Sequence, residues 1–162
     1  MTKPSTTFTQ IINDHPEYVF VESNVYCWSP ATNTISYIPG RTTGDCVISL
    51  LHELGHAKRQ HTSYSIDSQL VQMELEAWNT AQELCQKYGV SIPQSKVDES
   101  LDTYREWQLS RSLCPNCRLA GLQSDQTLDY TCINCARCWS VPENSQCVIQ
   151  RKVNPAKLAA QI

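Results

Sequence analysis

Apolar residues follow a strand-like pattern in the first quarter of the chain. Between residues 17 and 39, Val, Ile, Phe and Tyr recur at short spacing. Two strands are predicted, over residues 17–28 and 34–39, because β-branched and aromatic residues favour an extended backbone and residues 29–33 have turn chemistry. Residues 34–39 alternate apolar and polar positions and end in proline, which is typical of a strand at the exposed edge of a sheet.

A helical period replaces this pattern further along the chain. Asp45 is a plausible N-cap for a helix over residues 45–60. A second helix is predicted over residues 66–88 and ends at Gly89, and a third over residues 94–109. The helical period is lost near residue 110, where paired cysteines begin. The pattern therefore predicts an α+β fold followed by a cysteine-rich module.

The composition and the apolar runs of the chain indicate the cellular compartment in which we expect the protein. Hydrophobic residues make up 41% of the 162 residues, and nine residues are cysteines. The N-terminus lacks the apolar core of a secretory leader, and the longest apolar run, residues 46–51, is too short to span a bilayer. We therefore expect a cytoplasmic protein with no membrane partner. Thiols stay reduced in that compartment, so clustered cysteines indicate metal binding rather than disulfides.

The predicted helix over residues 45–60 contains the pattern HExxH, formed by His52, Glu53 and His56. A helix places residues four apart on one face, so both histidines can present imidazoles to one metal. Catalytic zinc sites keep one position for water, whose proton Glu53 can take. Apolar residues occupy the opposite side of this helix, and a polar strip along a buried helix is costly unless it has partners. The alternative is a surface helix whose histidines face solvent.

A catalytic zinc requires a third protein ligand, and the candidates are His61, Glu74 and Glu76. His61 follows His56 by five residues, without the glycine at which histidine-only zinc proteases turn sharply. Glu74 falls within the apolar face of the second helix, whereas Glu76 points to its polar side, where a carboxylate needs no partner. A carboxylate on a buried face is either paired or bound to metal. Glu74 is therefore the predicted ligand, and pairing with a basic side chain is its alternative role.

The segment HELGH, followed by Glu74-Leu75-Glu76-Ala77 and then Ala81, resembles the ImmA/IrrE-like metallopeptidases over about residues 17–90. These are zinc enzymes of the gluzincin type, so the resemblance implies a small zincin-like domain that hydrolyses a peptide bond in a specific intracellular protein. By resemblance, that protein is a transcriptional repressor or another regulator. The resemblance also implies that the first glutamate of the E-x-E-A motif, Glu74, is a zinc ligand.

The sequence departs from this family at one position. Trp78 stands where Asn or Asp is common, and in related gluzincins that polar residue orients a zinc-bound histidine. Support for the histidine must then come from elsewhere, with Asp67 and the backbone as candidates.

The resemblance further implies that the strand before the HExxH helix binds peptide substrate by edge pairing, a general mode of peptide recognition. The predicted substrate-binding residues are Ile35, Ser36, Tyr37 and Ile38.

The cysteine module contains two C-x2-C pairs separated by fourteen residues. Each pair presents two thiolates, and together they complete a closed tetrahedral zinc site. We interpret the module as a zinc ribbon with a structural role. Cys138 forms an overlapping pair with Cys135 and leaves open which of the two is a ligand, and Cys147 is a more distant substitute. The predicted ligands of this zinc are Cys114, Cys117, Cys132 and Cys135.

Charge separates the two parts of the chain. Residues 1–110 hold seven Lys/Arg and thirteen Asp/Glu, whereas residues 111–162 hold six and three. The predicted organisation is a metallopeptidase-like domain (1–110), a zinc ribbon (111–148) and a basic tail (149–162). The expected cofactors are two zinc ions, one catalytic and one structural. The expected partner is a protein substrate, and nucleic-acid binding through the ribbon and tail is the less favoured alternative.

Two other functions fit parts of the sequence. SprT-like proteases also join HExxH to a zinc ribbon, but they use a third histidine, for which only His61 is available after His56. A non-catalytic zinc-binding adaptor would act through its ribbon alone and would have no need for Glu53.

Overall fold

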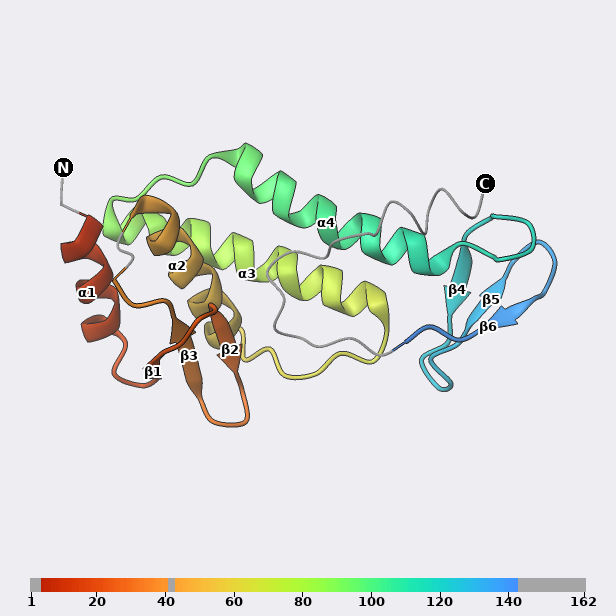
Figure 1. Ribbon diagram of the computed structural model, residues 1–162, viewed down its shortest axis with the longest axis horizontal. Helices are drawn as coiled ribbons and strands as arrows, with labels where there is room; N and C mark the ends of the chain where they lie inside the picture. Colours follow the sequence, from red (N-terminus) through yellow and green to blue (C-terminus); the bar gives the residue numbers. More distant parts are fainter. Residues whose placement is uncertain (1–3, 41–42, 143–162) are drawn as a thin grey trace. The chain divides into compact units, whose positions relative to one another are not determined.

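The computed structural model describes residues 4–40 and 43–142 of the 162-residue chain (Figure 1). Within these ranges there are four helices and two three-stranded sheets, which confirms the predicted α+β class. No helix in the described ranges is both long and apolar enough to cross a membrane. The predicted basic tail and Cys147 lie outside the described residues.

Contacts between residues divide the chain into two compact units. Unit 1 contains residues up to 62 and residues 73–97, and unit 2 contains residues 63–72 and those from 98 onward. Helices α3 (Asp67–Tyr88) and α4 (Gln94–Ser112) contribute residues to both units. Residues from both sides of position 110 therefore belong to unit 2.

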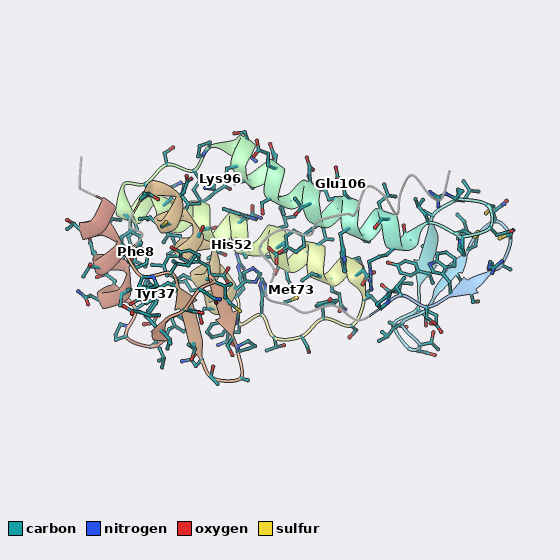
Figure 2. The ribbon with its side chains drawn as sticks, in the orientation of Figure 1. Phe8, Tyr37, His52, Met73, Lys96 and Glu106 are labelled. Carbon is teal, nitrogen blue, oxygen red and sulfur yellow. The ribbon has the colours of Figure 1, made fainter. Side chains whose placement is uncertain are left out.

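Unit 1 begins with helix α1 (Pro4–Asp14), which the apolar pattern did not predict. Phe8 and Ile11 are buried on one side of this helix. The Phe8 ring packs edge to face against Tyr37, with 5.4 Å between ring centroids (Figure 2). Threonine has low helix propensity, so the threonine-rich α1 depends on burial of this apolar side.

The first sheet consists of strands β1 (Val19–Glu22), β2 (Cys27–Ser29) and β3 (Thr34–Tyr37). The strand order is β1-β3-β2, with β3 parallel to β1 and antiparallel to β2. The single strand predicted over residues 17–28 is thus two short strands, placed on opposite sides of β3.

The prediction of residues 34–39 as an edge strand is wrong, because β3 lies between β1 and β2, and this removes the basis for expecting substrate to pair there. Ile35 and Ser36 have strand partners on both sides, Tyr37 pairs with β1, and Ile38 lies beyond the strand. Ile35 is also completely buried. A substrate strand could pair along β3 only by displacing a neighbour. Alternation along a strand indicates which side chains face the core, but it does not identify the neighbouring strands.

The three predicted helices are confirmed to within three residues at each end, as α2 (Gly44–Lys58), α3 and α4. Gly89 follows α3 with a φ of 63°, a conformation that glycine adopts without steric cost. Asp45 lies in the first turn of α2 rather than at the N-cap, which is Thr43. Asp45 instead forms an ion pair with Lys96.

Helices α2 and α3 approach each other closely at Gly55 and Ala77. A β-carbon on Gly55 would lie 2.4 Å from the Ala77 carbonyl oxygen and 3.1 Å from its carbonyl carbon. Glycine inside a helix lowers stability by roughly 0.5–1 kcal/mol relative to alanine. The close crossing explains why glycine is nevertheless present at position 55, since alanine would not fit there. The crossing lies beside His52 and His56 on α2 and three residues after Glu74 on α3.

Unit 2 has its own apolar cluster, formed by Leu70, Tyr104 and Trp107 with Tyr64 and Val71 packed against it. These residues come from the start of α3, the segment before it, and α4. The cluster explains why residues 63–72 group with α4, since apolar burial is the main stabilising term in a small unit.

A buried ion pair adds a polar anchor to unit 2. The carboxylate of Asp67 accepts hydrogen bonds from Arg111 Nε at 2.6 Å and from the Tyr130 hydroxyl at 2.9 Å. Arg111 also lies 4.6 Å from the centre of the Trp107 ring. The carboxylate of Asp67 is therefore engaged within unit 2, and the expectation that it orients a zinc-bound histidine is not met.

The second sheet belongs to the cysteine module and consists of β4 (Gly121–Gln123), β5 (Tyr130–Cys132) and β6 (Cys138–Trp139), all antiparallel. Tyr130 and Trp139 stack with 5.5 Å between ring centroids. The Trp139 indole N–H donates to the Arg111 carbonyl at 2.9 Å. The sheet is thereby joined by aromatic packing and hydrogen bonds to α4 within the same unit.

Candidate metal centres

Unit 1 contains a group of three side chains that could hold a metal ion: His52, His56 and Glu74. Their ligand atoms all lie within 4.8 Å of one another. The two histidine Nε2 atoms are 3.2 Å apart, and Glu74 carboxylate oxygens lie 3.2 Å from His52 Nε2 and 3.5 Å from His56 Nε2. His52, labelled in Figure 2, is 3% exposed and Glu74 is equally buried. In the described part of the chain, no fourth protein donor joins this group.

The chemistry of this group fits a divalent cation such as zinc. Imidazole nitrogen and carboxylate oxygen are zinc donors, and three protein ligands are usual where one coordination position stays open. Glu74 Oε2 is buried without a hydrogen bond, although it lies 3.2 Å from His52 Nε2, because the geometry between these atoms is not that of a hydrogen bond. A buried polar atom without a partner costs about 1–3 kcal/mol. A cation between these atoms would remove that cost.

The histidines and the glutamate also alter one another's protonation. Burial opposes ionisation of Glu74, but the close contacts and charge of His52 and His56 hold the pKa of this carboxyl well below its usual range. Burial alone would lower the pKa of His56, yet the adjacent Glu74 and the charge of Glu53 raise it. Without a metal, the group therefore stabilises itself as an ion pair.

Glu53 is buried beside the group and is held by the first sheet. The backbone N–H of Trp28 donates to Glu53 Oε2 at 2.8 Å. The indole N–H of Trp28 donates to the His61 carbonyl, also at 2.8 Å. β2, not β3, is therefore the strand whose backbone meets the predicted catalytic carboxylate. Nothing in the spacing of the sequence indicated a role for Trp28.

His61 lies next to the group without belonging to it. Its Nδ1 is 2.9 Å from His56 Nδ1, and its Nε2 is 3.2 Å from Glu76 Oε2. The donor group contains Glu74 rather than His61 or Glu76. The expectation that Glu76 needs no partner is wrong, because the chain after α2 turns back and brings His61 to it.

Trp78 supports His52 by packing rather than by a hydrogen bond. The two rings are 4.3 Å apart at their centroids and inclined by 33°. The buried Nδ1 of His52 has no hydrogen-bond partner in the described part of the chain. With Trp78 in place of Asn or Asp, the His52 ring is therefore oriented by packing against the Trp78 ring.

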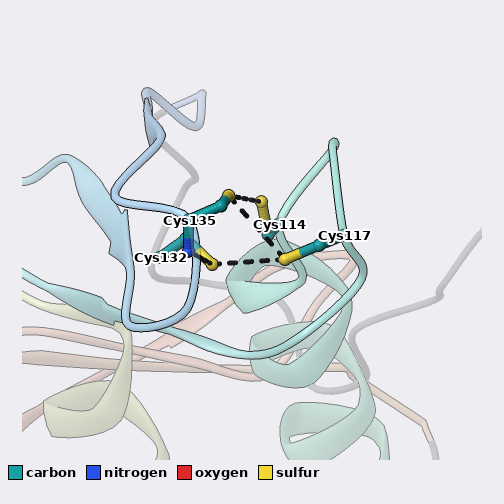
Figure 3. A group of neighbouring side chains, drawn as sticks. All are labelled: Cys114, Cys117, Cys132 and Cys135. Carbon is teal, nitrogen blue, oxygen red and sulfur yellow. Dashed lines mark hydrogen bonds between the residues drawn. The ribbon is translucent and has the colours of Figure 1, made fainter.

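The second group that could hold a metal consists of Cys114, Cys117, Cys132 and Cys135. Figure 3 shows the four sulfur atoms facing one another from two loops. Cys114 Sγ lies 3.6 Å from Cys135 Sγ, and Cys117 Sγ lies 3.4 Å from Cys132 Sγ. Four thiolates at such spacing form the closed donor set of a structural zinc site.

Each cysteine pair sits in a loop whose backbone N–H groups point at a sulfur atom. Backbone N–H groups of Asn116 and Asn134 donate to the first sulfur of their pair, each at 3.4 Å. The residue after each second cysteine, Arg118 or Ala136, has a positive φ of 64° or 57°, so the two loops share one conformation. The Leu119 backbone N–H and neighbouring thiols lower the pKa of Cys117 to about 6. Thiolates are the form that binds metal.

Cys138 lies outside the four-cysteine group. Its sulfur faces Thr131 Oγ1 at 3.4 Å on the exposed side of the second sheet. Of the two cysteines that the sequence left open, the structure thus brings Cys135 to the other three.

Comparison with models of known protein families, with curated proteins and with solved structures finds no match to this chain.

Proposed function

We propose that this chain is a zinc-dependent metalloendopeptidase that acts on a specific intracellular protein. The observation that carries the proposal is the convergence of His52, His56 and Glu74 beside Glu53. Three donors suit a catalytic zinc, because the fourth position remains for water or substrate. A non-catalytic metal site would have no use for a buried carboxylate one residue after its first ligand.

The residues of the site have separable roles in this proposal. A bound zinc supplies Lewis acidity, which activates a water molecule and polarises a peptide carbonyl. Glu53 takes the proton from the attacking water and passes it to the leaving amine. The Trp28 N–H holds Glu53 Oε2 and so fixes the orientation of that carboxylate.

The ligand set supports the gluzincin-type interpretation over the SprT-like one, because Glu74 joins the two histidines and His61 does not. By the same resemblance, we propose a zincin-like domain and a repressor or other regulator as substrate. We place the scissile peptide beside β2, since this strand contacts Glu53.

For the four-cysteine group we propose a structural zinc. The hydrogen bonds of Tyr130 to Asp67 and of Trp139 to Arg111 support this role, because they join the ribbon to the helical part of unit 2. We favour this role over nucleic-acid binding.

The test is the substitution Glu53→Gln. An amide cannot accept the proton at neutral pH, and loss of a general base lowers rates by about 10²–10⁴-fold. We expect zinc content and fold to be unchanged while cleavage products disappear from the proteome of cells that express the variant. Glu83→Gln, which changes an exposed glutamate on α3, is the matched control. Undiminished cleavage in Glu53→Gln would assign catalysis to other residues, and a retained biological effect without cleavage would support an adaptor.

A further inference from the structure

A chain of hydrogen bonds leads away from the first metal group. His56 presents Nε2 to His52 and Glu74, and its Nδ1 lies 2.9 Å from Nδ1 of His61. The other nitrogen of His61, Nε2, lies 3.2 Å from Glu76 Oε2. Three side chains from α2, the turn after it and α3 are thus connected in series.

The chemistry of these groups allows one consistent assignment of protons. Glu76, as a carboxylate, only accepts hydrogen bonds, so a neutral His61 must carry its proton on Nε2. Nδ1 of His61 is then an acceptor, and His56 must donate to it from its own Nδ1. When His56 is neutral, as metal binding requires, this leaves a lone pair on its Nε2, the atom that faces the other two donors. The opposite assignment would place a lone pair of His61 against the Glu76 carboxylate and a proton where a metal would bind.

The backbone around His61 is also arranged to hold this ring in place. Gln60 has a φ of 54°, a left-handed conformation that is unfavourable for a residue other than glycine. This turn allows the His61 N–H to bond to the His56 carbonyl at 3.1 Å. The Trp28 indole N–H fixes the His61 carbonyl. Strain of this kind concentrates at functional sites, where surrounding contacts impose it.

We propose that His61 and Glu76 are positioning residues that hold His56 in the tautomer able to bind a divalent metal. Glu76 sets the tautomer of His61, and His61 sets that of His56. The inference rests on the proposed role of His52, His56 and Glu74 as metal ligands. The two histidines differ in this respect. His52 has no hydrogen bond at Nδ1 in the described part of the chain, so His56 is the histidine of the pair whose orientation is fixed by a hydrogen bond.

The test measures zinc affinity of the full chain by competition with a chromophoric chelator, with the four-cysteine site as an internal reference. Loss of a group that orients a metal-bound histidine typically weakens binding by about 10–100-fold. We expect His61→Phe to fall in this range and Glu76→Ala to fall at its lower end. Glu76→Gln keeps an acceptor oxygen, so it should bind more tightly than Glu76→Ala. In a His61→Phe background, Glu76→Ala should have no further effect, because the series is already broken.

A second readout separates positioning from general stability. Nitrogen NMR of the zinc-loaded protein should show His56 protonated at Nδ1, with a chemical shift that moves in Glu76→Ala although Glu76 does not touch His56. The matched control is His15→Phe. His15 is a buried histidine of unit 1 that lies 3.0 Å from the Glu17 carboxylate and 3.0 Å from the Tyr88 hydroxyl, and it contacts none of the three donors. This variant should lower stability but not zinc affinity.

The proposal is overturned if Glu76→Ala and His61→Phe bind zinc within twofold of the wild type, or if His15→Phe weakens binding as much as they do. Glu76→Ala decides the matter alone if His61→Phe does not fold, because Glu76 is partly exposed. Wild-type protein that binds no zinc beyond the four-cysteine site removes the proposed function as well. Zinc binding that is normal in wild type and insensitive to His61 and Glu76 removes this inference only.

Discussion

The two candidate metal centres are built by opposite means. The four cysteines come from two short loops, and each loop forms its own pair of thiol ligands. His52, His56 and Glu74 come from two helices, and they converge only because α2 and α3 cross beside Gly55. The first kind of site depends on local turns, whereas the second depends on the packing of a whole unit.

The two groups of donors also differ in burial. All three donors of the unit 1 group are buried, and two of them have further side-chain contacts, His56 with His61 and His52 with Trp78. In the cysteine group, Cys117 is partly exposed and Cys135 is exposed. A module of this size has little apolar core, so a zinc ion bound there would supply folding energy. In unit 1 the fold exists around the donors, so a metal ion bound there would be left for chemistry, in line with the proposed function.

The largest effect is expected from Cys114→Ser. Structural zinc contributes on the order of 10 kcal/mol to the folding of small metal-dependent modules. Loss of this ligand should remove one zinc per chain and unfold the ribbon, with loss of the near-ultraviolet circular dichroism signal from the stacked Tyr130 and Trp139. Cys138→Ser is the control and should retain both zinc ions. If it loses zinc while Cys135→Ser does not, the fourth ligand has been assigned to the wrong cysteine.

The next largest effect is the difference in zinc affinity between alanine variants of two glutamates on α3. Glu74→Ala should abolish zinc binding in unit 1, with an affinity loss larger than the roughly 100-fold upper bound for residues that only orient a ligand. Glu76→Ala should still bind zinc at equimolar concentration, because its carboxylate contacts His61 rather than the donor group. Isothermal titration of both variants, with zinc retained at the cysteines, measures the difference. Equal losses in the two variants would mean that the helix places both carboxylates at the metal.

A smaller effect should follow from Gly55→Ala. The new methyl group would overlap the Ala77 carbonyl, so α2 and α3 must separate. Overpacking of this kind costs about 1–3 kcal/mol, and we expect a matching loss in thermal unfolding together with weaker zinc binding. Gly44→Ala is the control, since nothing lies within 4 Å of its added β-carbon. A Gly55→Ala variant with unchanged stability and zinc affinity would show that the crossing does not fix the site.

The smallest effect concerns pH in the metal-free protein. The lowered pKa of Glu74 contributes stability above its unfolded value, and this is lost as the pH falls through the folded pKa. The raised pKa of His56 contributes stability below its unfolded value, and this is lost as the pH rises through the folded pKa. The ion pair should therefore stabilise unit 1 most between about pH 4.3 and 6.5, the unfolded values.

Bound zinc should reverse the loss of stability that the metal-free protein shows as the pH rises through the folded pKa of His56. Metal binding requires neutral histidines, so the stabilisation that zinc adds should increase as the pH rises through the same range. Chemical denaturation at several pH values, with and without zinc, measures both trends. Glu74→Gln should flatten both curves. A metal-free wild type whose stability does not change across this range would mean that the ion pair is not formed in solution.

The parts of the molecule that depend on regular helices could be predicted well. The helical period predicted which side of α3 carries Glu74, and the structure brings that carboxylate to His52 and His56 while Glu76 points elsewhere. Cysteine spacing likewise predicted the four sulfurs that lie together. Both predictions succeed because the relevant geometry repeats along a few residues of sequence.

Features that depend on which distant segments become neighbours could not be predicted in this way. β3 lies between β1 and β2, and a period of two carries no information on strand order. The contact of His61 with Glu76 depends on a left-handed residue, Gln60, where a glycine would have been the usual signal. The Trp28 N–H reaches Glu53 only through the placement of the sheet.

The glycine at the crossing of α2 and α3 has a consequence for protein design. Helices usually pack with axes about 8–10 Å apart, and side chains at the contact set that spacing. Here the contact point is a bare backbone against the Ala77 carbonyl, with no room for a β-carbon at position 55, so the reach of the His52, His56 and Glu74 side chains is matched to a close approach of the two helices. Transplanting HExxH and a partner glutamate onto another helical scaffold will therefore require a glycine–alanine pair at the crossing. A scaffold with larger residues there will hold the three donors too far apart.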